Sequence, residues 1–385
     1  MRVLVLGCGE MAKVAIRDLV EHPVFQHVTI ATRRVPAAED FLATFPHGTV
    51  RLRVVGVDVQ QQETLAALMH QHDVTCNLAG PNYLNAVPVA RAAIAAGRPL
   101  VDVSDDFAAS LDLFGLDSAA RAAGVTIVMG LGASPGVTNI LARHGADQLD
   151  RVEEIRTSWI MRGSDMGGPA LIRHLLFSNT HRAFVFEDGA MREVRPFEDG
   201  RETIEYPVLG PVEVAHIGHP EPFMLARSFP SLRYADDKAT FLPTQVNSLL
   251  MELGRVARSG RPVPVGGRLS DPRDFAASYV LEHCRRLEGV SPIGALRTEV
   301  RGEVGGRAVR RVYAAAGRIG IGTGIPAAIG AMLLAIRKID QPGVQPPEAC
   351  IEPEWFLAAL DQRHIASIEE QVLDWEREPV AGARR

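Results

Sequence analysis

The sequence has few cysteines, no run of basic residues and no apolar stretch long enough to cross a membrane. Its four cysteines lie far apart, so they form neither a CxxC metal motif nor a disulfide framework, which favours a reducing compartment. Without basic segments interleaved with aromatics, nucleic acid and anionic membranes have no obvious surface to bind. The longest apolar stretch, GIPAAIGAMLLAI at residues 324–336, predicts a buried helix.

The start of the chain also lacks the charged region, apolar stretch and cleavage site of an export signal. We therefore expect a soluble, cytoplasmic protein that has neither nucleic-acid nor membrane partners. The composition is that of an ordinary globular protein, with 46% hydrophobic residues, 23% charged residues and a net charge of −5. Its 385 residues suffice for two or three domains.

The first part of the chain alternates short apolar runs with amphipathic helical patterns. Apolar runs without alternation are typical of strands that are buried on both faces, and strand–helix alternation predicts a parallel sheet. The expected class is α/β, with a doubly wound Rossmann sheet. Its strands are expected at residues 2–6, 27–31, 50–55, 74–79, 100–103 and 125–129.

Later segments predict a second α/β domain built on an antiparallel sheet, with hairpins at Asp188-Gly189 and Gly305-Gly306. We expect a Rossmann domain at 1–135, a substrate-binding and dimerisation domain at 136–320, and C-terminal helices at 321–385 that return toward the Rossmann domain. The strands of the second domain are expected at 152–161, 183–194, 203–208, 212–218 and 232–241, and helices at 169–178, 244–258, 271–287 and 323–338.

A GxGxxA pattern, formed by Gly7, Gly9 and Ala12, follows the first strand and opens a helix. The first glycine permits a tight turn, the second lets a pyrophosphate approach the main chain, and the helix N-terminus attracts its negative charge. Gly7, Gly9, Glu10 and Met11 are therefore predicted to contact a dinucleotide. The alternative is a purely structural turn.

The end of the second strand predicts which dinucleotide is bound. NAD-binding sheets place a carboxylate there, whereas this strand ends in Thr32, Arg33 and Arg34 and has no acidic residue before Glu39. Arginine matches a 2′-phosphate in charge and geometry. We predict that NADP(H) is preferred, with NAD(H) as the alternative; these arginines are otherwise solvated surface residues.

Other strand ends supply further candidates for cofactor binding. Asp58 ends the third strand, where it contacts adenine or caps the next helix. The segment NLAGPN ends the fourth strand and Val103 ends the fifth, where such sheets open their ligand crevice. The alternative for NLAGPN is a plain strand-to-helix turn. The candidates from these two strand ends are Ala79, Gly80, Pro81 and Val103.

The segments NLAGPNYLNAVPVARAAIAAGRPLVDVSDD and GLGASPGVTNILA resemble the saccharopine dehydrogenase-like family of NAD(P)-dependent oxidoreductases. The segments GPVEVAHIGHPEPFMLARSFPSLR and IDQPGVQPPE are most similar to its lysine 6-dehydrogenase branch. This resemblance implies a Rossmann domain, a substrate domain with an antiparallel sheet, and dimers or larger oligomers. It also implies chemistry at a carbon–nitrogen bond.

Candidate acid–base residues follow the fifth strand, in VDVSDD. Asp102, Asp105 and Asp106 are close in sequence, and neighbouring carboxylates raise one another's pKa, which suits a general acid or base. The alternative is that they cap the next helix. His216 and His219 are suited to proton exchange near neutrality. We expect no metal, because no second ligand cluster accompanies these histidines. Asp102, Asp105 and His219 are the predicted catalytic residues.

An amino-acid-like substrate needs a cation for its carboxylate, and arginine can bind a carboxylate through two parallel hydrogen bonds. Arg173 and Arg227 are candidates, although either can instead be a surface or ion-paired arginine. His174 and Asn139 complete the predicted substrate site.

These residues predict an NADP-preferring oxidoreductase that acts on the C–N bond of an amino-acid-like or polyamine-like substrate, as a homodimer. The alternatives are an NAD-dependent lysine 6-dehydrogenase and a non-catalytic NADPH-binding sensor.

Overall fold

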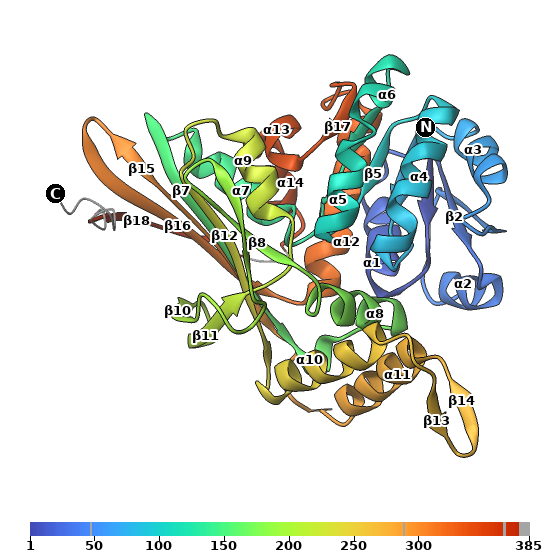
Figure 1. Ribbon diagram of the computed structural model, residues 1–385. Helices are drawn as coiled ribbons and strands as arrows, with labels where there is room; N and C mark the ends of the chain where they lie inside the picture. Colours follow the sequence, from blue (N-terminus) through green and yellow to red (C-terminus); the bar gives the residue numbers. More distant parts are fainter. Residues whose placement is uncertain (47, 288, 365–366, 377–385) are drawn as a thin grey trace.

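The computed structural model describes residues 1–46, 48–287, 289–364 and 367–376. The described chain forms a parallel sheet and a larger mixed sheet, with helix α12 (Ile319–Ala335) lying between them (Figure 1). The division at residues 135 and 320 remains our proposal for the domain boundaries. The arrangement of the two sheets confirms the predicted α/β class.

The first sheet has seven parallel strands in the order β17-β6-β5-β4-β1-β2-β3. Its middle strands are apolar because both faces are covered: Val3, Leu4, Val5 and Leu6 are all fully buried. The strands are β1 (Arg2–Leu6), β2 (His27–Thr32), β3 (Arg51–Gly56), β4 (Val74–Asn77), β5 (Leu100–Asp102), β6 (Thr126–Val128) and β17 (Gly343–Gln345). The accompanying helices are α1 (Glu10–Glu21), α2 (Val35–Leu42), α3 (Gln62–His70), α4 (Asn82–Ala96), α5 (Phe107–Phe114) and α6 (Asp117–Ala122).

The second sheet follows the order β10-β11-β12-β7-β15-β16-β18, with the β8–β9 hairpin paired to β12. It is mixed rather than purely antiparallel, which corrects our expectation. Strands β7 and β12 run parallel, because the chain returns to the same end of the sheet before starting β12. The strands are β7 (Arg151–Arg162), β8 (Ala183–Glu187), β9 (Ala190–Val194), β10 (Glu202–Tyr206), β11 (Gly210–His216), β12 (Tyr234–Leu242), β15 (Gly294–Val304), β16 (Arg307–Gly317) and β18 (Glu369–Asp374).

Helices and one small hairpin complete this part of the molecule. The predicted helix at 169–178 is confirmed as α8 (Pro169–Ser178), which begins with a proline at a position that needs no main-chain donor. The other elements are α7 (Val137–Ala146), η1 (Gly163–Asp165), α9 (Glu221–Ser228), α10 (Gln245–Arg258), β13 (Val263–Val265), β14 (Arg268–Ser270), α11 (Pro272–Arg285), α13 (Pro347–Cys350) and α14 (Pro353–Asp361).

The last part of the chain returns to both sheets. Helix α12 packs against α1 so closely that a Cβ on Gly324 would lie 2.5 Å from the main-chain oxygen of Met11. Strand β17 then extends the first sheet beside β6, and β18 pairs with β16 at the edge of the second. Residues 377–385 of the predicted C-terminal segment lie outside the described residues. No helix in the described ranges has the length and apolar character needed to cross a membrane.

Candidate active site

A cleft of about 420 Å³ is lined by residues that belong to, or follow, strands of both sheets. The carboxyl ends of the middle parallel strands form one wall, as is usual for ligand sites in doubly wound sheets. Residues of α8, β7, β15 and β16 form the opposite wall. The glycine loop and two buried histidines line the same cleft.

The loop between β1 and α1 has the conformation that its glycines predict. Gly7 adopts a φ of +96°, and a Cβ there would lie 2.8 Å from the carbonyl oxygen of Leu78. Gly9 is the N-cap of α1 and provides no side-chain cap, and a Cβ at this position would have no neighbour within 4 Å. Uncapped amides at a helix N-terminus attract a phosphate. The open space at Gly9 therefore fits the pyrophosphate of a dinucleotide.

The two arginines after β2 differ in their position. Arg34 lines the cleft, whereas Arg33 does not, although both are exposed. The main-chain N–H of Arg34 donates to Oγ1 of Thr32 at 3.2 Å. The Arg34 guanidinium forms no ion pair with any residue in the described ranges. It is therefore available to an anionic ligand.

The predicted cofactor-binding residues also divide into those that line the cleft and those that do not. The residues that line the cleft are Gly9, Glu10, Met11, Arg34, Gly80, Pro81 and Val103. Gly7, Thr32, Arg33, Asp58 and Ala79 lie outside its lining. Oδ1 of Asp58 accepts a hydrogen bond from the main chain of Gln60 at 3.1 Å. This bond stabilises the turn before α3. The N-cap of α3 is Gln61 and no side chain caps this helix, so Asp58 does not have the capping role given as its alternative.

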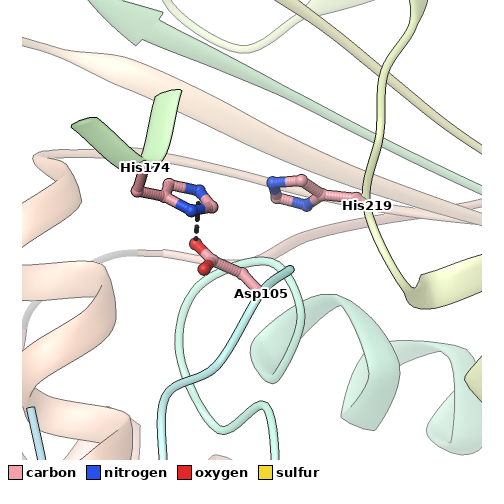
Figure 2. Close-up of side chains that lie close together, drawn as sticks. All are labelled: Asp105, His174 and His219. Atoms are coloured by element: carbon pink, nitrogen blue, oxygen red, sulfur yellow. Dashed lines mark ion pairs between the residues drawn. The ribbon is translucent and has the colours of Figure 1, made fainter. Parts of the chain in front are cut away.

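Asp105, His174 and His219 meet at the other end of the cleft (Figure 2). They come from the loop after β5, from α8 and from the loop between β11 and α9. Nε2 of His174 lies 3.2 Å from Oδ2 of Asp105, and the rings of the two histidines are 6.4 Å apart. The structure thus brings together three residues that are predicted from distant parts of the sequence.

The loop that carries Asp105 is fixed from both sides. Nδ2 of Asn82 donates to Oδ1 of Asp105 at 2.9 Å and to the carbonyl oxygen of Val103 at 3.4 Å. Asp106, the next residue, is buried and lies 3.1 Å from Nδ1 of His174. Both ring nitrogens of His174 therefore face carboxylates.

These contacts determine the charge of His174. Burial by itself would lower the pKa of this imidazole, but the carboxylates of Asp105 and Asp106 outweigh it and raise the pKa well above its usual value. In turn, although burial opposes ionisation of Asp105, His174 lowers the pKa of its carboxyl. At neutral pH the pair is an imidazolium beside a carboxylate.

His219 has a similar environment on its own side of the cluster. Its Nδ1 lies 3.4 Å from a carboxylate oxygen of Glu221 and 3.4 Å from one of Asp237. Burial alone would lower the pKa of His219, yet Glu221 and Asp237 raise it to about 9. Burial and the nearby Glu221 raise the pKa of Asp237 well above its usual value. His219 is therefore also protonated at neutral pH.

Asp102 and Asn139 lie behind the cleft instead of lining it. Asp102 accepts hydrogen bonds from Nδ2 of Asn77 at 2.6 Å and from the main chain of Ser104 at 2.7 Å. Burial raises its pKa to about 6, although both hydrogen bonds act in the opposite direction. Nδ2 of Asn139 donates to Oε2 of the buried Glu348 at 3.0 Å. Neither residue lines the cleft, and each is held by hydrogen bonds to its neighbours.

The two arginines predicted to bind a substrate carboxylate lie outside the cleft lining. Arg173 projects from α8 and forms an ion pair with Asp274 of α11. Arg227 lies at the end of α9, where its guanidinium carbon is 4.4 Å from the ring centroid of Phe114. Arg173 thus fits the alternative of an ion-paired arginine, and Arg227 that of a surface arginine.

Two groups of side chains place possible metal-ligand atoms within 4.8 Å of one another: Asp105, His174 and His219, and His219, Glu221 and Asp237. A histidine binds a metal through an unprotonated nitrogen. The surrounding carboxylates favour the protonated form of both histidines, which suits them for proton exchange.

Four residues of the site escaped sequence reasoning: Asn82, Ser134, Trp159 and Asp237. Asn82 and Ser134 stand within segments that already resembled the family, so their polar side chains were a usable signal. Asp237 belongs to two consecutive aspartates inside a strand, an unusual place for this residue. Trp159 carried no signal, because an apolar strand residue is ordinarily part of a core.

Comparisons with known proteins agree with this arrangement. Residues 3–128 match the family model for the saccharopine dehydrogenase NADP binding domain. A carboxyaminopropylagmatine dehydrogenase from Synechocystis is 23% identical over 390 residues, which cover 94% of this chain and 95% of that protein. Saccharopine dehydrogenase (L-Glu forming) from Saccharomyces cerevisiae has the same fold, with a TM-score of 0.69 and 16% identity over 97% of this chain and 99% of that one.

The fold and the matched domain are similar to those of NAD(P)-dependent oxidoreductases of the saccharopine dehydrogenase type. The relatives named above do not support the lysine 6-dehydrogenase branch specifically.

Proposed function

We propose that this protein is an NADP(H)-preferring oxidoreductase that acts on the C–N bond of an amino-acid-like or polyamine-like substrate. The observation that carries this proposal is the shared cleft. An open glycine loop lies at one end, and the buried cluster of Asp105, His174 and His219 lies at the other. A helix N-terminus with open space beside it and a buried pair of histidines therefore share one cavity, which supports the proposal.

The residues that line the cleft support a specific proposal for its cofactor end. The main chain of Gly9 to Met11 would hold the pyrophosphate, Arg34 the 2′-phosphate, and Gly80, Pro81 and Val103 the nicotinamide half. The bound cofactor supplies hydride transfer. The protein has to place a substrate carbon beside it and to control protons.

The reaction that fits these groups interconverts an amine and an imine. In the oxidative direction, bound NADP⁺ would accept a hydride from the carbon, and the neighbouring nitrogen would give up a proton, so that a C=N bond would form. Water then hydrolyses the imine to an amine and a carbonyl compound. Asp105 would accept a hydrogen bond from the substrate N–H, and His219 would exchange the proton of the nitrogen.

The charge of His219 favours one direction at neutral pH. Because Glu221 and Asp237 raise its pKa to about 9, the imidazole is mainly an acid at pH 7. An acid assists condensation and imine reduction, whereas amine oxidation needs the neutral imidazole. The rate of amine oxidation should therefore rise with pH up to about pH 9.

Two relatives suggest the probes. One is named for carboxyaminopropylagmatine and the other for saccharopine, and both names describe dehydrogenases. We propose a substrate of this class, a homodimer, as the family resemblance implies, and a cytoplasmic location. The four cysteines, which are free in the structure, suit that location.

The test is a spectrophotometric assay at 340 nm with saccharopine, carboxyaminopropylagmatine and L-lysine, each with NADP⁺ and with NAD⁺. We expect turnover of a secondary amine with NADP⁺. Lysine turnover with NAD⁺ would instead identify a lysine 6-dehydrogenase. Tight NADPH binding in calorimetry, without turnover in either direction, would indicate a sensor.

A further inference from the structure

A second group of polar side chains surrounds Nδ1 of His219, and the proposed reaction does not yet use it. Oγ of Ser134 donates to Oε1 of Glu221 at 2.5 Å, and Oε2 of Glu221 lies 3.4 Å from Nδ1 of His219. The side chains of Glu221 and Asp237 are fully buried. Ser134 itself lines the cleft.

The two carboxylates beside His219 are held in different ways. Asp237 accepts hydrogen bonds from Oγ1 of Thr157 at 2.7 Å and from Nε1 of Trp159 at 3.0 Å, so both of its carboxylate oxygens are fixed by strand β7. Among the described residues, Glu221 accepts a side-chain hydrogen bond only from Ser134, and its Oε2 has no hydrogen-bond partner. The position of Glu221 therefore depends on a single hydroxyl group.

That hydroxyl group is itself oriented by the protein. Oγ1 of Thr138, on α7, lies 3.4 Å from Oγ of Ser134 and can donate to it. The Ser134 hydroxyl hydrogen is then left for Glu221. Hydrogen bonds thus lead from α7 through Ser134 to Glu221, and the other carboxylate oxygen of Glu221 forms an ion-pair contact with Nδ1 of His219 at 3.4 Å.

We propose that Glu221, held by Ser134, is a positioning residue that fixes the imidazole of His219 through Nδ1 and leaves Nε2 for the substrate nitrogen. This inference rests on the proposed function, since it makes His219 the group that exchanges the substrate proton. A histidine oriented by a carboxylate at one nitrogen can exchange a proton at the other without turning its ring. Figure 2 shows the ring of His219 directed toward His174 and the centre of the cluster.

The groups that face His219 come from four elements. Glu221 belongs to α9 and Asp237 to β12, while Asp105 follows β5 and His174 lies on α8. The cationic His174 opposes a second positive charge nearby, whereas the three carboxylates favour it. Removing the negative charge of Glu221 should therefore make His219 a stronger acid.

The experiment compares Ser134→Ala, Ser134→Thr and Glu221→Gln with the matched control Ser164→Ala, which changes a serine outside the cleft lining. NMR spectra of the NADPH-bound full chain, with ¹⁵N-labelled histidine rings, follow His219 as a function of pH. We expect its titration midpoint to fall by about one pH unit or more in Glu221→Gln and by less in Ser134→Ala. Ser134→Thr, which retains the hydroxyl group, should restore the wild-type curve.

Amine oxidation gives a second measurement, with the probe among saccharopine and carboxyaminopropylagmatine that the wild-type protein turns over. Above about pH 9, where the imidazole is mainly neutral in wild type and variant alike, we expect kcat to fall about tenfold in Ser134→Ala and KM to change little, with recovery in Ser134→Thr.

A His219 titration that is the same in wild type, Ser134→Ala and Glu221→Gln would overturn the inference, even if the enzyme is active. If neither probe is turned over, the proposed function fails, while the NMR titration still decides whether Ser134 and Glu221 position His219. Because Ser134→Ala removes only one hydroxyl group from a half-buried residue, it tests the inference even if Glu221→Gln does not fold.

Discussion

The two ends of the cleft use different parts of the polypeptide. At the cofactor end, Gly9 to Lys13 form one continuous segment and offer mainly main-chain groups at the start of α1. At the chemical end, Asp105, His174 and His219 come from three distant segments and act through side-chain charge. Main-chain recognition tolerates most side-chain changes, whereas a buried charge cluster depends on each member. Substitutions at the two ends should therefore change different quantities.

The largest effect is expected at the chemical end, for His174→Gln. This change removes the cation between Asp105 and Asp106, so turnover should fall about 100-fold or more. The affinity for NADPH should stay near that of the wild type, because the glycine loop is untouched. Steady-state kinetics and calorimetry measure the two effects.

His181→Gln is the matched control, since His181 is exposed just after the same helix. In His174→Gln, Asp105 and Asp106 lose their shared partner, so the protein can also lose stability. Thermal unfolding of both variants therefore shows whether a loss of turnover comes from a loss of stability. If His174→Gln kept full turnover, our statement that the chemical end depends on each of its charged side chains would be wrong.

A smaller effect is expected at the cofactor end, for Arg34→Ala. Loss of a charge-assisted contact to the 2′-phosphate should weaken NADPH binding about tenfold and leave NADH binding almost unchanged. Arg33→Ala is the matched control, because Arg33 is the neighbouring exposed arginine and does not line the cleft. Calorimetric titrations with both cofactors provide the comparison.

Equal losses of NADPH affinity in the two variants would show that the two arginines share the phosphate. No loss in either variant would remove the physical basis for the predicted NADP preference.

The same contrast explains how far the sequence could predict this molecule. The glycine loop and the strands of the first sheet follow from local patterns, and residues 2–6 and 169–178 form a strand and a helix with the predicted bounds. Strand β17 could not be predicted, because its three residues lie in a proline-rich stretch and form a strand only by pairing with β6. Likewise, the parallel pairing of β7 with β12 depends on the path of the intervening chain.

At the site, residue types pointed to Asp105, His174 and His219 singly, while their meeting point is a property of the fold. Their catalytic and binding roles stay predictions. Asp237 became visible only when β12 was placed beside β7, where Thr157 and Trp159 hold its carboxylate next to His219. Sequence patterns therefore predict the glycine loop, which is one continuous segment, better than the cluster of side chains that the fold brings together from distant segments.

The smallest effect is expected for Arg227→Ala, which tests a residue that sequence reasoning placed at the chemical end. Its guanidinium carbon lies 4.4 Å from the ring centroid of Phe114 and 5.9 Å from that of Phe223, outside the cleft lining. Loss of an exposed cation–π contact should cost about 0.5–1 kcal/mol of unfolding free energy. Turnover should change less than about twofold, since no neighbouring charge of the cluster is altered.

Denaturant unfolding and steady-state kinetics of Arg227→Ala, with Arg227→Lys as the variant that keeps the cation, measure both quantities. If KM for the amine rose tenfold or more in Arg227→Ala and recovered in Arg227→Lys, Arg227 would reach the substrate after all. In that case the substrate-bound protein must bring the end of α9 toward the cleft, and the chemical end would extend beyond the buried cluster. Unchanged KM, together with the small loss of stability, would restrict the chemical end to the side chains that line the cleft.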